Sequence, residues 1–402
     1  MLKSPVFHQS TTVNRSPDLA VREIRTTEEL ESIRPLWNAL LMKSAAPVLY
    51  LTYDWLSTWW QCFQTPRKKL SVLAVFENDE LVGIAPFVRT RAYWLGIPYV
   101  KMEFISMMRY ALSPTNISGT LDFIIRADKH QEVIPAVMEF LLKKAWPWNY
   151  IRMHPLPSGS PSQKPLENAA GKIGFRFWKR PVFVNSIIRL NRPWTEYTAE
   201  VGRKFRKNIQ GHEKRLQNNG VLRYSELNAI EQLENGFNSI LSIERRSWKW
   251  NKGIHIDAPV YRHFYRQLVE VAGKNGWLKL GIMSLDGKNI AYDLSLEFNR
   301  SIEGLKTSYD EKYAHYSPGN VLIYHQLESV FQKGYTKKNL LWGDLNVKTK
   351  WTSTVEPHDE ILIYRNDLFS NVLYFINHRL FLYRLTRFLF NQTQMLYWKL
   401  GS

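Results

Sequence analysis

The chain has 402 residues, 45% hydrophobic and 22% charged, which is the composition of a folded protein and excludes wholesale disorder. Its length allows two or three units with a sizeable core. A single cysteine, Cys62, excludes a disulfide framework and a multi-cysteine zinc site. Lysine and arginine number 54 against 36 aspartate and glutamate, and the resulting net charge of +18 attracts anions such as nucleic acid, phosphorylated cofactors or anionic membranes.

The two ends of the chain differ in composition from the middle. Residues 1–19 are polar and predict a disordered lead without the apolar core of a signal peptide. The sequence contains no run of 18 apolar residues, which a membrane-spanning helix would need, so we expect a cytoplasmic protein. Residues 363–402 are rich in Phe, Leu and Tyr and are interrupted by basic residues. They predict an amphipathic helical tail that either lies on the inner face of the cytoplasmic membrane or docks on the protein's own core.

The first half of the chain between these ends predicts a mixture of helices and strands. Apolar residues recur at helical spacing after Thr27, a candidate N-cap, and a second helix follows Thr52. Two β-forming runs are joined by Asn78 and Asp79, which is the pattern of a hairpin. The expected strands lie at 20–25, 70–77, 80–89, 150–153 and 182–190, and the expected helices at 27–41, 53–63, 133–145 and 166–173.

The second half predicts the same design. Segment 278–297 resembles segment 71–89 in order: a strand, a two-residue acidic turn, a small residue and another strand, which indicates internal duplication. We therefore expect an α/β fold, of the α+β kind with a mixed sheet, in two tandem units at 20–190 and 191–362. The expected helices lie at 195–218, 231–248, 260–274 and 321–333, and the strands at 222–226, 277–285, 288–298, 301–308 and 340–342.

Two segments that follow predicted strands carry groups suited to chemistry. In YDEKYAHYSPG (309–319), Pro318 and Gly319 open a helix whose free N–H groups and dipole attract phosphate. In GDLNVKTKW (343–351), Asp344 is a candidate general base and Lys348 a candidate partner of that base or of an anion. The alternatives are a plain strand-to-helix turn for the first segment and a surface turn with an ion pair for the second.

Three further features have both a functional and a structural interpretation. Lys204 and Arg206 belong to a basic helix that either clamps phosphates or is a solvated face. Glu244 either faces a site or pairs with an arginine. Histidine and cysteine form no cluster with metal-ligand spacing, so no metal cofactor is expected.

The segments SYDEKYAHYSPG (308–319) and GDLNVKTKW (343–351) carry a family resemblance. The chain resembles the GNAT superfamily of acyltransferases over about 20–360. Within it, the chain looks like the cellulose-biosynthesis-associated (CelD-like) branch, which is related to the FemAB peptidoglycan-bridge peptidyltransferases. The resemblance implies two GNAT-like units, a donor thioester between two central strands, and direct attack of an amine on that thioester.

The resemblance also implies roles for individual residues. Asp344 would be the base, Lys348 would orient this base or the substrate, and Tyr309 or Tyr313 would protonate the leaving thiolate. The remaining residues would bind ligands: Ser317, Gly319, Asn320, Lys204 and Arg206 the donor, and Glu244, Trp248, Asp310 and Trp351 the acceptor.

These features predict an N-acyltransferase. The donor would be acyl-CoA or an acyl-carrier protein, and the acceptor a small-molecule or lipid amine of an envelope lipid, sugar or amino-acid precursor. One alternative is a FemAB-like transferase that uses aminoacyl-tRNA, which the charge favours and the lack of a long helical hairpin between the units disfavours. Another is a non-catalytic basic protein that binds RNA or membranes. Nucleic acid is expected as a partner only under these alternatives.

Overall fold

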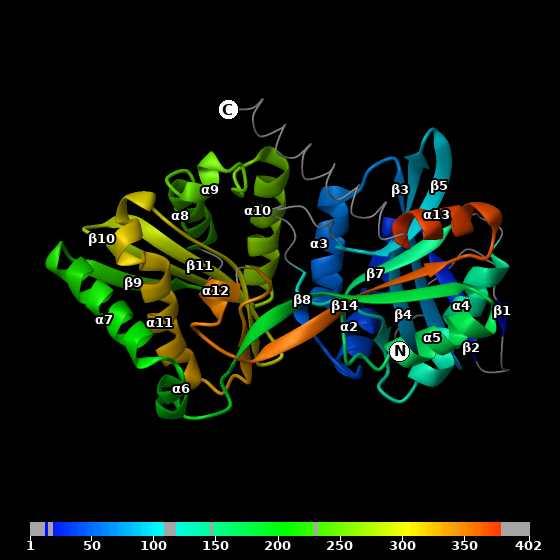
Figure 1. Cartoon of the computed structure of the whole chain (residues 1–402), viewed down its shortest axis with the longest axis horizontal. Coiled ribbons are helices and arrows are strands. Elements are labelled where there is room, and N and C mark those ends of the chain that lie inside the picture. Colours follow the sequence, from blue (N-terminus) through cyan, green and yellow to red (C-terminus); the bar gives the residue numbers. More distant parts are fainter. Residues whose placement is uncertain are drawn as a thin grey trace.

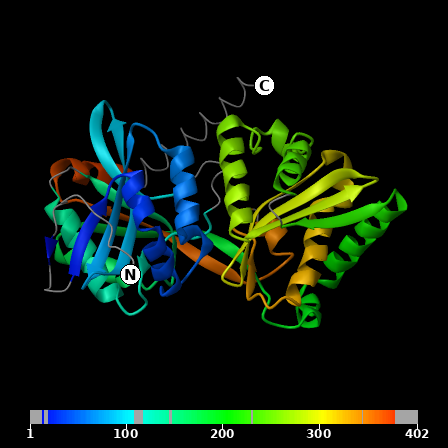
Figure 2. The same cartoon turned by 180° about the vertical axis from the view of Figure 1, so that it is seen from behind.

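The computed structural model describes residues 13–14, 19–107, 118–144, 148–228, 232–343 and 345–378, which form two lobes joined by long strands (Figures 1 and 2). Most of the N-terminal lead and the tail beyond His378 lie outside the described residues, and so does Asp344. No helix in the described ranges is both long and apolar enough to span a bilayer.

The first unit is a sheet flanked by helices that form where local signals predict them. The Thr52 hydroxyl accepts a hydrogen bond from the Trp55 N–H (3.2 Å) and so begins the helix α3. Asn78 and Asp79 have φ values of 47° and 65°, the left-handed pair that a tight hairpin requires. The elements of this unit are β1 (Val13–Asn14), β2 (Leu19–Ile24), α1 (Thr27–Ser32), α2 (Arg34–Met42), η1 (Leu49–Leu51), α3 (Tyr53–Phe63), β3 (Lys68–Glu77), β4 (Glu80–Trp94), β5 (Ile97–Phe104), β6 (Ile124–Ile125), α4 (His130–Lys143), β7 (Tyr150–Pro157), α5 (Gln163–Lys172) and β8 (Arg176–Arg189).

The second unit repeats this arrangement. Asp286 and Gly287 have φ values of 50° and 77° and close the hairpin between β10 and β11, as the duplicated pattern predicts. The elements are α6 (Trp194–Glu200), α7 (Arg203–Asn218), β9 (Leu222–Leu227), α8 (Leu233–Glu244), α9 (Trp248–Asn251), α10 (Pro259–Lys274), β10 (Leu278–Leu285), β11 (Lys288–Phe298), β12 (Ser301–Tyr309), η3 (Glu311–Tyr316), α11 (Pro318–Phe331), β13 (Lys337–Asn339), α12 (Leu345–Lys348), β14 (Val355–Tyr364) and α13 (Leu368–His378).

All strands of the described chain belong to one mixed sheet. Its order is β1-β2-β3-β4-β5-β7-β14-β8-β13-β12-β11-β10-β9, with β6 paired to β4. Neighbouring strands are antiparallel except for β5 with β7 and β12 with β13, which are parallel. The long strand β8 joins the two halves, because residues 176–186 pair with β14 and residues 187–189 pair with β13.

The last strand returns to the first unit. β14 lies between β7 and β8, so the chain crosses back into the first lobe after completing the second (Figure 1). The expected boundary at residue 362 falls inside this strand. The first helical part of the expected tail, α13, packs on the first lobe, where Phe369 contacts Trp94 and Tyr99 with ring centroids 6.4 Å apart in each case.

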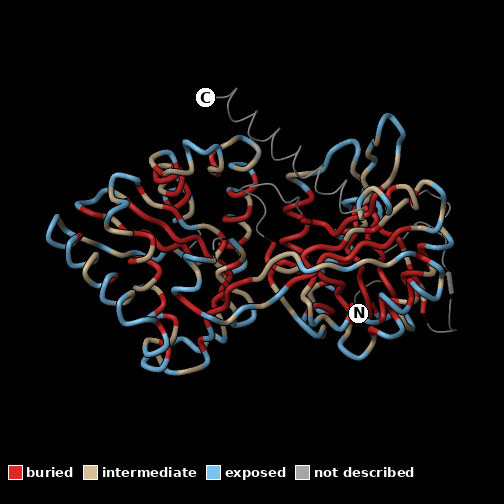
Figure 3. Tube along the Cα trace, in the orientation of Figure 1, coloured by how far each residue is buried: buried red, intermediate tan, exposed pale blue. Residues whose placement is uncertain are grey.

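One apolar core extends through both lobes, a smaller one lies within the second, and a third cluster packs α13 on β14. Buried residues accordingly follow the interior of both lobes (Figure 3). At the junction α3 packs against α10, where the Trp55 and Phe264 rings meet edge-on at 6.5 Å. Beside them the Tyr50 hydroxyl and the Asn339 amide donate to the same buried oxygen of Glu303, at 2.9 and 2.8 Å. Burial raises the pKa of Glu303 despite these bonds. The two lobes therefore share both apolar and polar contacts.

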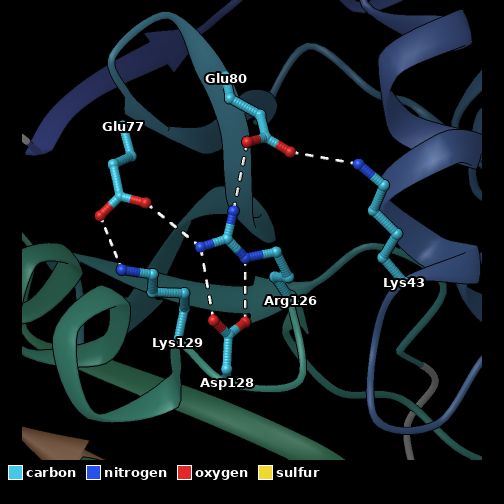
Figure 4. A network of polar contacts seen from close by, with 6 residues as sticks. All are labelled: Lys43, Glu77, Glu80, Arg126, Asp128 and Lys129. Atoms are coloured by element: carbon cyan, nitrogen blue, oxygen red, sulfur yellow. Dashed lines mark hydrogen bonds and ion pairs between the residues drawn. The ribbon is translucent and has the colours of Figure 1, made fainter.

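A surface network ties the β3–β4 turn of the first unit to the segment before α4 (Figure 4). The Arg126 guanidinium donates to Asp128 (2.9 Å) and pairs with Glu77 and Glu80 (3.2 Å each), and Lys129 pairs with Glu77 (2.7 Å). Exposed ion pairs contribute little individually, so we assign this network a positioning role at the outer end of the lobe.

Several helical predictions needed correction. The helix expected over 27–41 is two helices, α1 and α2, which part at Ile33, and the helix expected over 231–248 ends at Glu244. Thr26, not Thr27, is the first N-cap, because Thr26 and Glu29 exchange hydrogen bonds in a capping box. The helix expected over 195–218 is two helices, α6 and α7. They part at Val201 and Gly202, whose ψ values of 120° and 127° are extended and not helical.

The strand expected at 340–342 was also placed too late. Strand β13 ends at Asn339, and Leu341 has a φ of 60°, a left-handed conformation that a strand residue does not adopt. The misplaced end matters for function, because residues 340–342 form part of the wall of the cavity described next.

Candidate active site

The two parallel strands in the second unit diverge towards one end. β12 and β13 pair only over residues 301–303 and 337–339. Beyond this point β12 continues along β11, whereas the chain after β13 turns to β8 and the Leu340 N–H donates to the Ser186 carbonyl (2.8 Å). Gly304 stands where the strands part, and a Cβ atom there would lie 3.2 Å from the Asn339 carbonyl oxygen.

The divergence opens a cavity of about 570 Å³. This volume lies in the range of small-molecule sites. Its wall comes from the strands on either side, from α9, from the start of α11 and from α12. It is lined by Trp248, Lys249, Ile254, Asp293, Gly304, Leu305, Lys306, Thr307, Tyr309, Ser317, Gly319, Asn320, Ile323, Lys338, Leu340, Leu341, Trp342, Val347, Lys348 and Trp351.

Helix α11 begins at the edge of this cavity. Ser317 has a φ of 47° and precedes Pro318, which supplies no N–H. A Cβ atom on Gly319 would lie 3.5 Å from the Tyr309 ring and 3.8 Å from the Thr307 hydroxyl, both of which line the cavity. The unencumbered backbone at Gly319 and the dipole of a 14-residue helix suit the binding of a phosphate group here.

Four lysines line the cavity, and the protein holds three of them. The Lys338 ammonium pairs with the buried Asp293 carboxylate (3.0 Å). The Lys249 ammonium donates to the Thr307 carbonyl (2.6 Å) and lies 3.6 Å from Glu244. Burial lowers the pKa of Lys249 although Glu244 opposes this effect.

The third lysine, Lys348, supports the cavity wall. Its ammonium donates to the backbone carbonyls of Leu340, Leu341 and Trp342, the last two at 2.8 and 2.6 Å. These carbonyls follow β13, and the Leu341 carbonyl also accepts a hydrogen bond from the Ser186 N–H of β8 (3.2 Å). The prediction gave Lys348 the task of orienting a base or the substrate, and the structure shows it holding the segment that keeps the two strands apart.

Six of the other predicted residues lie together on the cavity wall: Trp248, Tyr309, Ser317, Gly319, Asn320 and Trp351. They come from α9, β12, the start of α11 and the segment after α12. Burial raises the pKa of the Tyr309 phenol, which therefore carries a proton at neutral pH. A protonated phenol is what the predicted role as an acid requires.

Asp310 and Tyr313 do not line this cavity. Asp310 is buried and pairs with Arg246 and Lys288 (2.8 Å each). Although burial opposes them, these bonds hold the pKa of Asp310 below its usual value. Tyr313 lies under Lys288, with the ammonium 5.7 Å from the ring centroid. Asp310 thus anchors the turn before α11, where we expected a residue that binds the acceptor.

Glu244, Lys204 and Arg206 also lie away from the cavity. Glu244 is fully buried behind Lys249 and accepts hydrogen bonds from the Tyr292 hydroxyl (2.6 Å) and the Ile256 N–H (3.2 Å). Arg206 donates to the carbonyl of Val201, the C-cap of α6 (3.2 Å). Lys204 lines a second cavity of about 520 Å³ between α7 and residues 349–353, which shares Trp351 with the first.

Among the cavity residues that sequence reasoning missed, five are charged or shape the gap between the strands: Lys249, Asp293, Gly304, Lys306 and Lys338. All belong to strands or to a short helix and have no recognisable motif around them. The one available signal was a glycine and a lysine within the predicted strand SIEGLKTS (301–308), where a buried strand favours apolar residues.

The matching position in the first unit is filled by the chain itself. β5 and β7 are parallel over three residue pairs, like β12 and β13. Beyond them the Leu121 N–H donates to the Pro155 carbonyl (2.7 Å), and β6 pairs with β4. The rings of Phe87, Phe104 and Phe123 pack together there, with centroids 5.2 to 5.8 Å apart. Segment 118–125 therefore takes the place that is open in the second unit.

Comparison with known families agrees with this geometry. Residues 203–349 match the model of the acetyltransferase (GNAT) domain family. This part of the chain is a GNAT domain. It contains the two diverging strands, the start of α11 and the cavity between them. The chain as a whole has a mixed α/β fold of two similar units, and this domain lies in the second.

Solved structures support the fold over most of the length. A crystal structure of FemX has a TM-score of 0.59 at 11% identity and covers 89% of this chain and 100% of its own. A conserved protein of unknown function from Bacteroides thetaiotaomicron VPI-5482 has a TM-score of 0.52 at 14% identity and covers 86% and 100%. Among curated proteins, no sequence matches significantly. At these identities the likeness concerns the fold, and the GNAT domain indicates an acyltransferase.

Proposed function

We propose that the chain is an N-acyltransferase that binds an acyl-CoA in the GNAT domain and transfers the acyl group to an amine. The observation that carries this proposal is the cavity between β12 and β13, which ends at the start of α11. The acyl chain and its pantetheine arm would lie between the strands, and the phosphates would lie against the Gly319 N–H and the Asn320 side chain at the start of α11. Tyr309 would give a proton to the leaving thiolate.

The acceptor belongs in our proposal to the amines of envelope lipids, sugars or amino-acid precursors. Peripheral contact with a membrane would bring a lipid acceptor close. Leu95, at the tip of the β4–β5 hairpin, and Leu368, at the start of α13, are 83% and 84% exposed. Exposed apolar groups on a protein with a net charge of +18 suit an anionic bilayer. The expected membrane contact of residues 363–402 would then include the hairpin tip.

Vesicle flotation tests the membrane contact. The full chain should float with vesicles of phosphatidylglycerol and phosphatidylcholine, and a variant with Leu95→Asp and Leu368→Asp should remain at the bottom. Equal flotation of both proteins would remove this surface from the proposal.

A second donor class has its own supporting observation. α7 exposes five basic residues: Arg203, Lys204, Lys207, Lys214 and Arg215. The helix lies at the outer edge of the second lobe (Figures 1 and 3). Such a surface suits the acidic face of an acyl-carrier protein or the backbone of an aminoacyl-tRNA. The fold similarity to FemX also favours the alternative in which aminoacyl-tRNA is the donor.

Calorimetric titration distinguishes these donors. The protein is titrated at two salt concentrations with each candidate donor. These are acetyl-CoA, palmitoyl-CoA, free CoA, acyl-carrier protein, deacylated tRNA and aminoacylated tRNA. Saturable binding of a CoA ester supports the proposal, and the preferred chain length gives the acyl class. Tight binding of tRNA without affinity for CoA esters would overturn it in favour of the FemAB-like alternative.

A charge placed at the start of α11 gives a sharper test of the phosphate site. Gly319→Asp adds a carboxylate where the phosphates would bind and should weaken CoA-ester binding at least about 10-fold, or about 1.4 kcal/mol. Gly211→Asp is the matched control, because Gly211 lies on α7 and a Cβ atom there meets nothing within 4 Å. Equal affinities of the two variants would show that phosphate does not bind at α11.

A further inference from the structure

Lys306 differs from the other lysines of the cavity. It lies on β12 beyond the last residue that pairs with β13, so it stands where the strands have parted. Its side chain is partly exposed and lines the cavity. Among the described residues, no hydrogen bond or ion pair holds its ammonium, whereas Lys249, Lys338 and Lys348 are each held by carbonyl or carboxylate oxygens.

Lys306 and the phosphate site lie on opposite faces of β12. The neighbouring Thr307 side chain faces α11, because its hydroxyl would lie 3.8 Å from a Cβ atom on Gly319. Successive side chains of a strand point to opposite faces, and Lys306 interacts electrostatically with Glu244 of α8 and Lys249 of α9. A donor with its phosphates at α11 would present its thioester through the gap to this second face, where an amine acceptor would arrive.

The charges around Lys306 favour its neutral form. Burial lowers the pKa of Lys306 to about 7, the cations Lys249 and Lys348 lower it further, and Glu244 opposes them. The other charged groups of the cavity, Asp293 and Lys338, pair with each other. A base works best when its pKa is near the operating pH, and a desolvated lysine meets this condition.

We propose that Lys306 is the general base that takes the proton from the attacking amine in the GNAT domain. The nitrogen lone pair of the acceptor forms a C–N bond with the thioester carbonyl carbon, and the C–S bond breaks to release the thiolate. The proton lost by the nitrogen passes to the Lys306 amine, and the Tyr309 phenol gives its proton to the thiolate; the Lys306 ammonium and the Tyr309 phenolate then exchange their protons with water. This inference rests on the proposed function. It places the base on β12, whereas the sequence suggested Asp344.

A reaction without an acceptor tests both the position and the neutrality of Lys306. A neutral amine beside a bound thioester should itself be acylated slowly when no other amine is present. The full chain is incubated with acetyl-CoA or palmitoyl-CoA between pH 6 and 9, and acyl-lysines are quantified by peptide mass spectrometry. Lys306 should be modified saturably with donor concentration and, at pH 7.5, at least about 10-fold faster than the exposed Lys207 and Lys214.

The pH profile provides an internal control. Modification of Lys306 should level off above about pH 7. Lys279 is the matched partly buried lysine, and it should stay unmodified because Glu297 and Glu226 hold its ammonium at 2.9 and 3.3 Å. If a CoA ester binds saturably while Lys306 stays unmodified, the proposed base is wrong although the proposed function stands.

Two further measurements separate the remaining outcomes. If no CoA ester binds, the proposed function fails. The pH dependence of Lys306 labelling by acetic anhydride still decides the protonation state of this residue. A labelling midpoint near pH 7 supports a neutral amine, and a midpoint near pH 10 overturns it. With ethanolamine as a probe acceptor, Lys306→Arg should release CoA about 10²–10⁴-fold more slowly than the natural chain while its CoA-ester affinity stays within about 3-fold. Equal release by the two proteins would overturn the role as base.

Discussion

Replacing Lys348 by Met tests whether this residue supports the cavity wall or takes part in the chemistry. The variant removes the Lys348 donor from the carbonyls of Leu340, Leu341 and Trp342, of which Leu341 keeps its bond from the Ser186 N–H. A hydrogen bond to a charged group contributes about 1.5–3 kcal/mol, and the ammonium is partly exposed, so water replaces some of it. Taking about 1.5 kcal/mol for each of two unreplaced bonds, we expect the free energy of unfolding to fall by about 3 kcal/mol.

Thermal unfolding measures this loss. An unfolding entropy of about 2.1 cal/mol/K per residue over 402 residues gives about 0.84 kcal/mol/K, so Tm should drop by about 4 °C. CoA-ester affinity should fall as well, since the wall is no longer held. Lys207→Met is the control, because Lys207 is exposed on α7 and its removal should change Tm by less than about 1 °C. An unchanged Tm combined with lost turnover in Lys348→Met would refute the supporting role and favour a chemical one.

Two predictions concern stability elsewhere. Trp55→Ala should lower the free energy of unfolding by about 3–5 kcal/mol, because it leaves a cavity against Phe264 at the junction of the lobes. A loss below about 1 kcal/mol in urea unfolding would contradict the packed junction. Burial raises the pKa of Asp122 to about 6, although bonds from Ser160 and the Phe123 N–H oppose it. The folded state thus holds this proton more tightly than the unfolded chain. The stabilisation from this group should therefore be complete below about pH 4, and the free energy of unfolding should fall by about 3 kcal/mol as the pH rises to about 6. Asp122→Asn should lack this fall, and parallel pH profiles of the two proteins would refute the assignment.

Local signals predicted much of the fold. The turns at Asn78–Asp79 and Asp286–Gly287 were predictable because few residues tolerate a positive φ at both central positions of a tight hairpin. Thr52 marked the start of α3 because its hydroxyl satisfies a free N–H of the first turn. These features depend on residues within four positions of one another, which the sequence displays directly.

Part of the candidate site was predictable for the same reason. The segment YSPG (316–319) shows a helix start after a strand, and the start of α11 does lie on the cavity. The neighbouring acid was not predictable, since Asp310 looks as suitable for ligand binding as any carboxylate in a loop. Its partners Arg246 and Lys288 come from other elements, and they engage it in ion pairs outside the cavity.

By itself, the sequence determined the two-unit design, the hairpins, the basic helix and the start of α11, because each depends on local backbone preference or on the spacing of apolar residues. Only the tertiary structure decided which unit has an open gap: segment 118–125 closes the first, and the second stays open where Gly304 lets β12 and β13 part. It also decided which lysine of the cavity has no partner among the described residues. Both outcomes depend on the pairing of strands far apart in the chain, such as the return of β14 between β7 and β8, and no short-range pattern specifies that pairing.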